Sequence, residues 1–277
     1  MAERFFKYHG LGNDFVILDR RGSGRDIDEA QARALCDRRL GIGADGVLVM
    51  LPSAQGVARM VVHNPDGGIP EMCGNGLRCA AKFLGDHTPG QPALLEIETG
   101  AGVLPCRLDY AGGQVAEVEI SMGPARLVAP NLPSGRSGNP FIRGQVEGFA
   151  GVVGTAVSMG NPHLVLFDSD PQQALRAGPK LEHAPGFPDR TNVEFARLDG
   201  GEIEVVVWER GAGLTQACGT GACATVAAAV VEGRLPAGGW TPVRLPGGRL
   251  LIQVAKDLSE VRLRGPATFV FEGGLPA

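Results

Sequence analysis

The 277-residue chain has a formal net charge of −4, with 44% hydrophobic and 20% charged residues. This length suffices for two domains with buried cores, and the composition is typical of a globular protein rather than a disordered one. Basic and acidic residues are interspersed, and no apolar run approaches the ~18 residues needed to cross a bilayer, so we expect neither nucleic acid nor a membrane as a partner.

The N-terminal stretch MAERFFKYHG lacks the basic segment, apolar stretch and cleavage site of a secretory signal, which predicts a cytoplasmic protein. Cysteines in that compartment are expected to be reduced. Six are present, without the paired spacing of zinc ligands: Cys36, Cys73, Cys79, Cys106, Cys218 and Cys223. No metal is expected, and reactive thiols are the remaining chemical use of these residues.

Short β-like runs rich in Val, Ile and Leu make up most of the chain, from FFKYHG and DFVILD in the first half to EVRLRG and TFVFEG at the end. Helices are expected over 28–40, 74–84 and 219–232. The last two consist of small and apolar residues with almost no charge, which predicts that they are buried. The segment 126–148 is rich in Pro, Gly and Ser and is expected to be a linker or a long loop between the halves.

Two segments 145 residues apart repeat one another. EMCGNGLRCA (71–80) and QACGTGACAT (216–225) share a cysteine, two glycines and the start of a small-residue helix. Three further pairs align at offsets of about 145 to 149: 12–19 with 160–168, 44–50 with 191–197, and 60–76 with 205–221. A period of half the chain predicts two similarly folded domains related by an approximate two-fold axis, with equivalent loops facing each other across a cleft.

Cys73 and Cys218 each stand directly before a predicted helix. The positive end of a helix dipole favours thiolate and is expected to bring the cysteine pKa below its free value of ~8.5. The N–H groups of 74–76 and 219–221 lack acceptors within their helices and can bind an anion, with glycine permitting close approach. Two such helix ends that converge would hold a carboxylate between two thiols.

This arrangement predicts a cofactor-independent racemase or epimerase. One thiolate removes the proton from the carbon beside the carboxylate, and a thiol on the opposite face returns a proton, which inverts the centre. The helix-end N–H groups stabilise the charge that develops on the carboxylate. The two cysteines should therefore titrate as a coupled pair.

A buried cysteine near a helix start is more often a small core residue, and we apply this interpretation to Cys36, Cys79, Cys106 and Cys223. The duplicated Cys-Gly-[Asn/Thr]-Gly context favours a catalytic role for the other two. Glycine-rich loops before helices also occur at phosphate sites. No GK[ST] follows either loop, and neither matches a dinucleotide fingerprint, so nucleotide binding is not expected.

In these residues the chain resembles the diaminopimelate epimerase family, the PLP-independent epimerases of lysine and cell-wall biosynthesis. The resemblance covers the whole chain in order: GNDFVILD, LCDRRLGIGADGVL, NPDG with MCGNGLRCAAKFL, SMGNPH, RTNVEF, and WERGAG with ACGTGACAT. It implies an α+β fold of two pseudo-symmetric domains, each a β-sheet or barrel around a central helix. The implied domains are 1–120 plus 265–277, carrying Cys73, and 121–264, carrying Cys218.

The resemblance also implies the reaction and its residues. The reaction interconverts LL- and meso-diaminopimelate for lysine and peptidoglycan precursors, without a cofactor, with Cys73 and Cys218 as the two bases. Backbone N–H groups of four residues would hold the reacting carboxylate: Gly74, Asn75, Gly219 and Thr220. Six side chains would bind the amino groups and the distal carboxylate: Asn13, Asn64, Asn161, Asn192, Glu209 and Arg210.

The chemistry of these side chains suits a substrate with an amino acid group at each end, because an Arg fork binds carboxylate and amides both donate and accept. Alternatives stand beside these roles. Three of the asparagines lie in turn-like contexts where Asn bonds its own backbone, and Glu209 with Arg210 can form a solvated surface pair. His163 matches a family position near the thiols, where it would tune the thiolate population, and a structural histidine is the alternative.

Two sites depart from the family pattern. Leu214 replaces the acid of Arg-Gly-x-Gly-Glu-Thr, and the loop 67–71 carries a proline in place of a more polar stretch. Both are expected to alter thiol tuning, loop order or substrate choice. The first alternative function is therefore a two-thiol racemase of proline, hydroxyproline or histidine, which Leu214 favours and Asn64, Asn192 and Arg210 oppose.

The second alternative is a non-catalytic amino acid binding protein, with a redox sensor that closes a Cys73–Cys218 disulfide as its variant. A protein without catalysis would be expected to lose one cysteine, and this chain retains both. For the assembled state we expect a homodimer.

Overall fold

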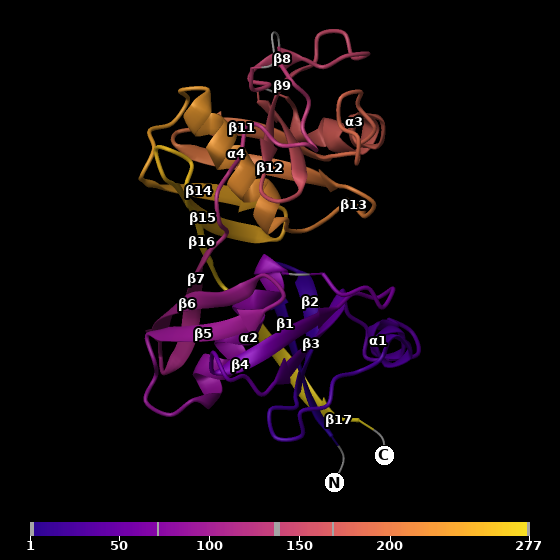
Figure 1. The fold of residues 1–277 in the computed structure, drawn as a ribbon, viewed down its shortest axis with the longest axis vertical. Coiled ribbons are helices and arrows are strands. Elements are labelled where there is room, and N and C mark those ends of the chain that lie inside the picture. The colour runs from indigo at the N-terminus through magenta and orange to yellow at the C-terminus, as the bar shows by residue number, and fades with distance from the viewer. Residues whose placement is uncertain (1–2, 71, 136–138, 168, 276–277) are drawn as a thin grey trace. The chain divides into compact units, whose positions relative to one another are not determined.

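The structure, a computed structural model, describes residues 3–70, 72–135, 139–167 and 169–275 (Figure 1). The chain forms two compact units. Unit 1 comprises Met1–Ile120 and Arg264–Ala277, and unit 2 comprises Ser121–Leu263. Each unit is a mixed β-sheet packed on a buried helix, which confirms the predicted α+β class.

In its described residues, unit 1 has two helices, α1 (Glu29–Cys36) and α2 (Gly74–His87). Its strands are β1 (Arg4–Gly10), β2 (Asn13–Asp19), β3 (Gly46–Leu51), β4 (Ala58–His63), β5 (Leu94–Thr99), β6 (Gly102–Ala111), β7 (Gln114–Ser121) and β17 (Thr268–Gly274). Hydrogen-bonded neighbours follow the order β17-β1-β2-β3-β4-β5-β6-β7, in which β2–β3 and β4–β5 are parallel pairs and the others antiparallel. The last strand of the chain thus pairs with the first.

Unit 2 contains α3 (Ala174–Leu181), α4 (Gly219–Val231) and the short 3-10 helix η2 (Pro171–Gln173). Its strands are β8 (Gly144–Gln145), β9 (Val153–Ser158), β10 (Pro162–Phe167), β11 (Asn192–Asp199), β12 (Glu202–Glu209), β13 (Gly213–Leu214), β14 (Trp240–Leu245), β15 (Gly248–Val254) and β16 (Val261–Gly265). The central order is β9-β10-β11-β12-β14-β15, with β10–β11 and β12–β14 parallel and the other pairs antiparallel.

The internal repeat seen in the sequence extends to the strand pairing. In each unit five successive strand pairs alternate between antiparallel and parallel, beginning and ending with an antiparallel pair. The six strands are β1 to β6 in unit 1 and β9, β10, β11, β12, β14 and β15 in unit 2. The aligned segments occupy equivalent strands, β2 with β10, β3 with β11 and β4 with β12. The prediction of two similarly folded halves is confirmed.

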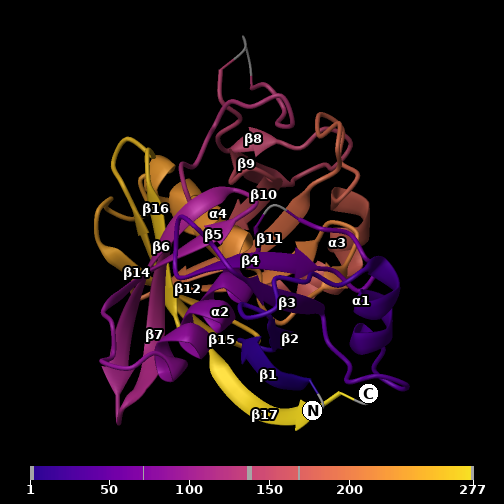
Figure 2. The same cartoon turned by 60° about the horizontal axis from the view of Figure 1, so that its bottom comes forward.

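The helix that follows each cysteine is central to its unit. Helix α2 packs against strands β1 to β6, and α4 packs against β9, β10, β11, β12, β14 and β15 (Figures 1 and 2). Both helices are buried, as predicted, and every residue of α4 from Gly221 to Ala229 is buried. An almost uncharged sequence is required there because strands contact the helix on several sides. No helix in the described part of the chain is long and apolar enough to cross a membrane.

Helices α2 and α4 begin at the predicted residues, whereas α1 is shorter than expected. It ends at Cys36 rather than at 40, because the side chain of Asp37 accepts hydrogen bonds from the backbone N–H groups of Arg39 and Leu40 and turns the chain. Such local side-chain bonds compete with helix continuation.

Helix α3 was not predicted, and its sequence explains why. It contains Gly178 and Pro179, both unfavourable in helix interiors. The glycine is required by packing, because a Cβ at this position would lie 2.6 Å from Cγ of Trp208. Tertiary packing thus overrides the local preference.

The segment 126–148 is part of unit 2 and not a linker between the halves. Leu132 and Val146 are buried in the same cluster as Phe187 and Phe195. The Pro, Gly and Ser content reflects an irregular backbone, which the apolar residues nevertheless anchor to the core. Residues 136–138 of this segment lie outside the described residues.

Candidate functional site

Cys73 is the N-cap of α2, with extended backbone angles of φ −136° and ψ 111°. Its Sγ accepts a hydrogen bond from the backbone N–H of Gly76 at 3.4 Å. The side chain is half-buried. A cysteine therefore occupies the position at which Ser or Asp usually accepts from the first turn of a helix, and its sulfur lies at the positive end of the dipole.

A polar network that runs from buried Arg78 and Asn75 to exposed Asp45 holds the first turn of α2 in unit 1. Asn75 donates from Nδ2 to Oδ1 of Asn13 at 3.1 Å, and its Oδ1 accepts from Nη2 of Arg78 at 3.0 Å. Asn13 in turn donates to Oδ2 of Asp45 at 2.9 Å. Of the residues predicted for this unit, the structure thus brings Asn13 and Asn75 together beside the helix that Cys73 caps.

Arg78 is fully buried, and sequence reasoning missed it. Besides Asn75, its guanidinium donates to the carbonyl oxygens of Gly74 and Pro266, both at 3.4 Å. The arginine thereby joins the start of α2 to the segment before β17. The available signal was the pair of charged residues, Arg78 and Lys82, within the mostly apolar stretch GLRCAAKFL.

Asn64 lies at a turn immediately after β4. Its backbone N–H donates to the carbonyl oxygen of Gly68 at 2.8 Å, and its carbonyl oxygen accepts from Gly67 at 2.9 Å. The side chain is half-buried. Ile69, in the same loop, is 62% exposed, and Leu214 at the equivalent position of the repeat is 44% exposed. Of the two departures, Leu214 is an exposed apolar side chain, whereas the proline of the 67–71 loop, Pro70, is half-buried, and Glu71 lies outside the described residues.

Cys218 repeats the geometry of Cys73 in unit 2. It is the N-cap of α4, with φ −117° and ψ 108°, and its Sγ accepts from the N–H of Gly221 at 3.3 Å. A second contact runs to Oγ1 of Thr220 at 3.5 Å. Cys218 is only 5% exposed, so its thiol is more deeply buried than that of its counterpart.

Burial reverses the predicted direction of the Cys218 pKa. Desolvation is the largest cause and raises the pKa well above the ordinary value of 9.0, and the charge of Glu209 raises it further. Bonds from Thr220 and Gly221 favour the thiolate and lower the pKa by less. The expectation of a depressed pKa is therefore wrong for this cysteine, because the helix end cannot offset the loss of water around a buried charge.

A chain of hydrogen bonds leads away from Cys218 through predicted residues. Asn161 donates from Nδ2 to Oγ1 of Thr220 at 3.3 Å, and its Oδ1 lies 3.0 Å from Nε2 of His163. The other ring nitrogen, Nδ1, lies 2.6 Å from Oε1 of Glu194. His163 and Glu194 are both fully buried. His163 thus has partners on both nitrogens and is joined to the thiol indirectly.

Asn192 and Arg210 also come together in unit 2. Asn192 Oδ1 accepts from the backbone N–H of Arg210 at 2.9 Å, and Nδ2 donates to the carbonyl oxygen of Pro162 at 2.9 Å. The guanidinium of Arg210 donates from Nη1 to the carbonyl oxygen of Asp189 at 2.9 Å. The Asn192 amide therefore uses Oδ1 and one Nδ2 hydrogen to bind the protein backbone. The second Nδ2 hydrogen can be donated to a ligand.

Glu209 and Arg210 are less exposed than the solvated surface pair considered from the sequence. Both are half-buried, and Oε1 of Glu209 accepts from the hydroxyl of Thr215. A buried carboxylate that sequence reasoning missed, Glu182, fixes the loop beyond them. It accepts from Trp208 Nε1 at 2.8 Å and from the N–H of Gly211 at 3.0 Å, which anchors the chain on both sides of 209–210.

The four cysteines assigned to the core are all buried: Cys36, Cys79, Cys106 and Cys223. Burial raises the pKa of Cys79 and of Cys106 to about 12, and also raises that of Cys36. Thiols with such a pKa are inert near neutral pH. Their interpretation as core residues is confirmed.

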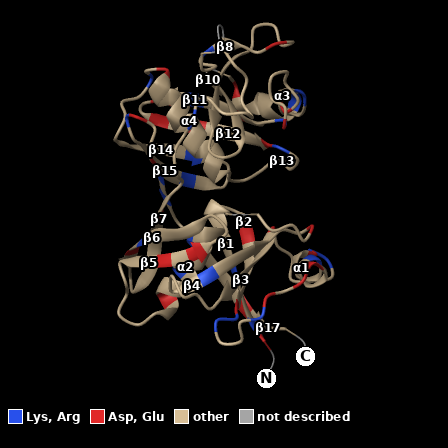
Figure 3. Ribbon diagram, in the orientation of Figure 1, with Lys and Arg blue, Asp and Glu red and all other residues tan. Residues whose placement is uncertain are grey.

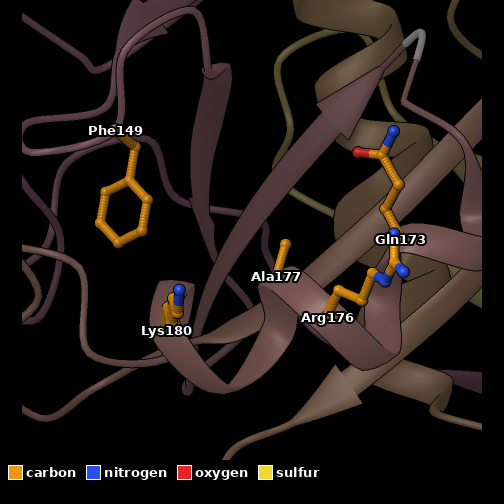
Figure 4. Close-up of a pocket in the computed structure, with 5 residues that line it drawn as sticks. All are labelled: Phe149, Gln173, Arg176, Ala177 and Lys180. Atoms are coloured by element: carbon orange, nitrogen blue, oxygen red, sulfur yellow. The ribbon is translucent and has the colours of Figure 1, made fainter.

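A cavity of about 300 Å³ in unit 2 lies against α3 (Figure 4) and does not contain these residues. Its lining consists of Phe149, Gln173, Arg176, Ala177 and Lys180. The side chains include no carboxylate, thiol or histidine. Basic and acidic residues are interspersed along the ribbons of both units (Figure 3). The candidate site therefore lies at the helix N-termini and not in this cavity.

Each unit thus presents a sulfur and a helix N-terminus surrounded by amides. Such a surface can bind a carboxylate through backbone N–H groups and exchange a proton with the adjacent carbon through sulfur. Glu194 is the third residue that sequence reasoning missed. It lies between Val193 and Phe195 in a buried strand, and a lone acid in such a run is the signal that identifies it.

Comparisons with known proteins agree with this chemistry. The sequence matches the profile of the diaminopimelate epimerase family over residues 5–128 and 155–270. The diaminopimelate epimerase of Desulforudis audaxviator is 47% identical over 275 residues, covering 97% of this chain and 98% of that protein. That of Desulfitobacterium hafniense is 45% identical over 280 residues, covering 97% and 96%.

The fold has counterparts among solved structures. The phenazine biosynthesis protein of the PhzF family from Bacillus anthracis matches 100% of both chains with a TM-score of 0.71 and 16% sequence identity. At that identity the likeness concerns the fold alone, and it agrees with the two-unit α+β architecture described above. With a profile match that spans both units, the chain belongs to the diaminopimelate epimerase family.

Proposed function

We propose that the chain interconverts LL- and meso-diaminopimelate by two-base proton transfer between Cys73, Cys218 and the α-carbon, without a cofactor. The observation that carries this proposal is the matched geometry of the two cysteines. Each caps the central helix of its unit, and each sulfur accepts from the N–H three residues ahead. Core cysteines have no reason to repeat such a position, whereas two-base chemistry needs one thiol for each face of the substrate.

The reaction begins when a thiolate removes the α-proton from one face. The electron pair left on carbon delocalises into the carboxylate, and the thiol opposite transfers its proton to the other face. Backbone N–H groups of Gly74, Asn75, Gly219 and Thr220 bind that carboxylate and stabilise the charge that it gains. Burial raises the pKa of Cys218, which favours the thiol form of this cysteine.

Recognition of the distal amino acid group is assigned to amide and charged side chains. Asn13, Asn64, Asn161, Asn192, Glu209 and Arg210 take this role. Arg210 uses one of its five N–H donors on Asp189, and its planar fork suits a carboxylate. A substrate that lacks the distal group would forgo the charge-assisted bonds to Arg210, which selects against simple amino acids.

The proposal includes the setting of the enzyme. A supplier of lysine and peptidoglycan precursors acts in the cytoplasm, where the thiols stay reduced. We further propose a homodimer. Strand β17 exposes three neighbouring large side chains, with Phe269 44%, Val270 50% and Phe271 44% exposed, and such an apolar patch favours contact with a second copy. Sedimentation of the wild type and of Val270→Arg measures this: only the variant is expected to be monomeric.

The experiment that tests the function follows deuterium incorporation at the α-carbon of LL-diaminopimelate in D₂O, under reductant and without added cofactor. Wild type, Cys73→Ala and Cys218→Ala are compared. Exchange with inversion in the wild type and its loss in both variants is the expected result. If the wild type leaves this substrate unchanged, the assignment fails, and the same assay on proline, hydroxyproline and histidine distinguishes a racemase from a binding protein.

A further inference from the structure

Glu194 is buried on β11 in a position that no step of the proposed reaction uses. Its exposure is 0%, as is that of its partner His163. Oε1 lies 2.6 Å from His163 Nδ1, whereas Oε2 has no hydrogen-bond partner among the described residues. A fully charged carboxylate with one bare oxygen in the interior is costly. The carboxyl therefore needs a proton of its own or a cation beside it.

The bonds of His163 decide where the hydrogens are. Asn161 presents Oδ1 to Nε2, so Nε2 must carry a hydrogen and donate it. The short Nδ1–Oε1 contact then contains a second hydrogen, shared between the ring and the carboxyl. Together Glu194 and His163 hold two hydrogens and no net charge. In this state the bare Oε2 is tolerated, because the pair as a whole is neutral.

The same direction of donation continues to the thiol. Asn161 donates from Nδ2 to Oγ1 of Thr220 at 3.3 Å, which occupies a lone pair of that oxygen. The hydroxyl hydrogen of Thr220 is then directed to Cys218 Sγ at 3.5 Å. From His163 onward, every link donates toward Cys218. With the N–H of Gly221 at 3.3 Å, a thiolate there accepts two hydrogen bonds.

We propose that Glu194 is a positioning residue for the reaction: with His163 it forms a neutral, doubly hydrogen-bonded pair that, through Asn161 and Thr220, aims a hydroxyl donor at the Cys218 thiolate. This inference rests on the proposed role of Cys218 as one of the two bases. It explains how a thiol buried to 5% exposure can lose its proton at all, since a chain of aligned donors strengthens the last bond.

A rival interpretation predicts the opposite change in the acidity of Cys218 when Glu194 is replaced. If Glu194 were an isolated carboxylate, its charge would oppose thiolate formation at Cys218, as that of Glu209 on β12 does. Removing a carboxylate would then make the thiol more acidic. Removing the neutral anchor of a donor chain makes it less acidic. His163 on β10 is the titratable group that contacts the Glu194 carboxyl from the neighbouring strand.

The experiment measures the rate at which iodoacetamide alkylates Cys218 at pH 8 under reductant, with the Cys218 peptide quantified by mass spectrometry. Variants are made in the Cys73→Ala protein, which removes coupling between the two thiols. They are Glu194→Gln, Glu194→Ala, Thr220→Val and the pair Glu194→Ala with Thr220→Val. Thr225→Val is the matched control, because it deletes a buried hydroxyl from the same helix that bonds Gly221 O and not the sulfur.

Loss of one hydrogen bond to a charged group shifts a pKa by about one unit, so Thr220→Val is expected to react roughly tenfold more slowly. Glu194→Ala is expected to slow the reaction similarly, and the double variant no further, because both changes break one chain. Glu194→Gln retains a donor toward Nδ1 and stays within about twofold of its parent, as does Thr225→Val.

Faster alkylation in Glu194→Gln or Glu194→Ala would overturn the proposal in favour of a bare carboxylate. Additive slowing in the double variant would also overturn it, since Glu194 would then act by another route. If Glu194→Ala does not fold, the two other single variants still test the proposal. Glu194→Gln should react at nearly the rate of its parent, and Thr220→Val should react more slowly. Alkylation does not require catalytic turnover, so its rate can be interpreted even if the wild type does not exchange diaminopimelate. Failure of that exchange would count against the proposed function alone.

Discussion

The backbone nitrogen of Gly221 lies 3.3 Å from Cys218 Sγ, and the same glycine has no room for a side chain. A Cβ built on it would meet Glu194 Oε1 at 3.0 Å, Val207 Cγ2 at 3.1 Å and the sulfur itself at 3.2 Å. The second glycine of the Cys-Gly-Thr-Gly motif is therefore needed where strand, acid and thiol converge on the first turn of α4.

Gly221→Ala is accordingly expected to lower kcat/KM for diaminopimelate by at least tenfold. The methyl group pushes on the sulfur and on Glu194, which displaces the thiol from its N–H donor, and overpacking costs about 1–3 kcal/mol of folding free energy. Steady-state kinetics with urea unfolding checks both effects. Gly239→Ala is the control, since a Cβ there meets nothing within 4 Å. Equal losses in the two variants would contradict the argument.

The sequence predicted much of this region because its constraints are local. Cys73 and Cys218 were predicted at helix starts from their glycine-rich contexts, and both are N-caps. The strand repeat was likewise visible, because each half needs the same apolar strands. Helix α3 was missed, since Gly178 is explained only by Trp208, more than twenty residues away in sequence.

The environment of the site could not be predicted in the same way. The sequence shows a cysteine at a helix end, which favours thiolate, but it does not show how completely strands β10 to β12 bury that cysteine. Burial decides the direction of the Cys218 pKa. The bonds among Asn161, His163 and Glu194 also depend on the parallel pairing of β10 with β11, which sets His163 opposite Asn192, two residues before Glu194.

Glu182 provides a second test, because it holds the loop that carries Glu209 and Arg210. It is 6% exposed and accepts from Trp208 Nε1, Gly211 N–H and Arg190 Nη1, the last at 2.7 Å. Glu182→Ala removes a buried carboxylate that accepts three part-buried hydrogen bonds, at a cost of about 1.5–3 kcal/mol in folding free energy.

The same variant is expected to raise KM for diaminopimelate severalfold, since Arg210 follows Trp208 and precedes Gly211. Chemical unfolding and initial-rate kinetics measure the two effects. Glu204→Ala removes a carboxylate of the exposed Arg197–Glu204 ion pair and is expected to change stability by less than about 0.5 kcal/mol. A Glu182 variant as stable as this control would refute the anchoring role.

Alkaline pH is expected to destabilise the protein through its buried thiols. Burial raises the pKa of Cys106 from 9.0 to about 12. A raised folded-state pKa stabilises the protein fully below the unfolded value, and this contribution is lost as pH rises through the interval up to the folded value. The free energy of unfolding should therefore fall from about pH 9 upward.

Cys106→Ala isolates this contribution. One proton contributes a slope of about 1.4 kcal/mol per pH unit, so the whole interval for one thiol amounts to roughly 4 kcal/mol. Urea unfolding under reductant at pH 8, 9 and 10 should give a shallower decline for the variant than for the wild type, although the variant starts from a lower value because of its cavity. Parallel declines would show that the thiol does not contribute.

Arg210→Lys tests the assignment of the distal carboxylate. The planar fork of arginine can bind a carboxylate through two parallel bonds while Nη1 contacts Asp189 O, whereas an ammonium offers a single point charge. The loss of one charge-assisted bond corresponds to about 1.5–3 kcal/mol, so kcat/KM is expected to fall by about tenfold to a hundredfold. Arg197→Lys, on the exposed end of β11, is the control and should remain near wild type.

The division between KM and kcat shows where Arg210 acts. Binding of the distal group is the same in the ground state and the transition state, so the loss should appear mainly in KM. If Arg210→Lys instead lowers kcat and leaves KM unchanged, the guanidinium contacts the reacting end, and the assignment of the distal carboxylate to this residue fails.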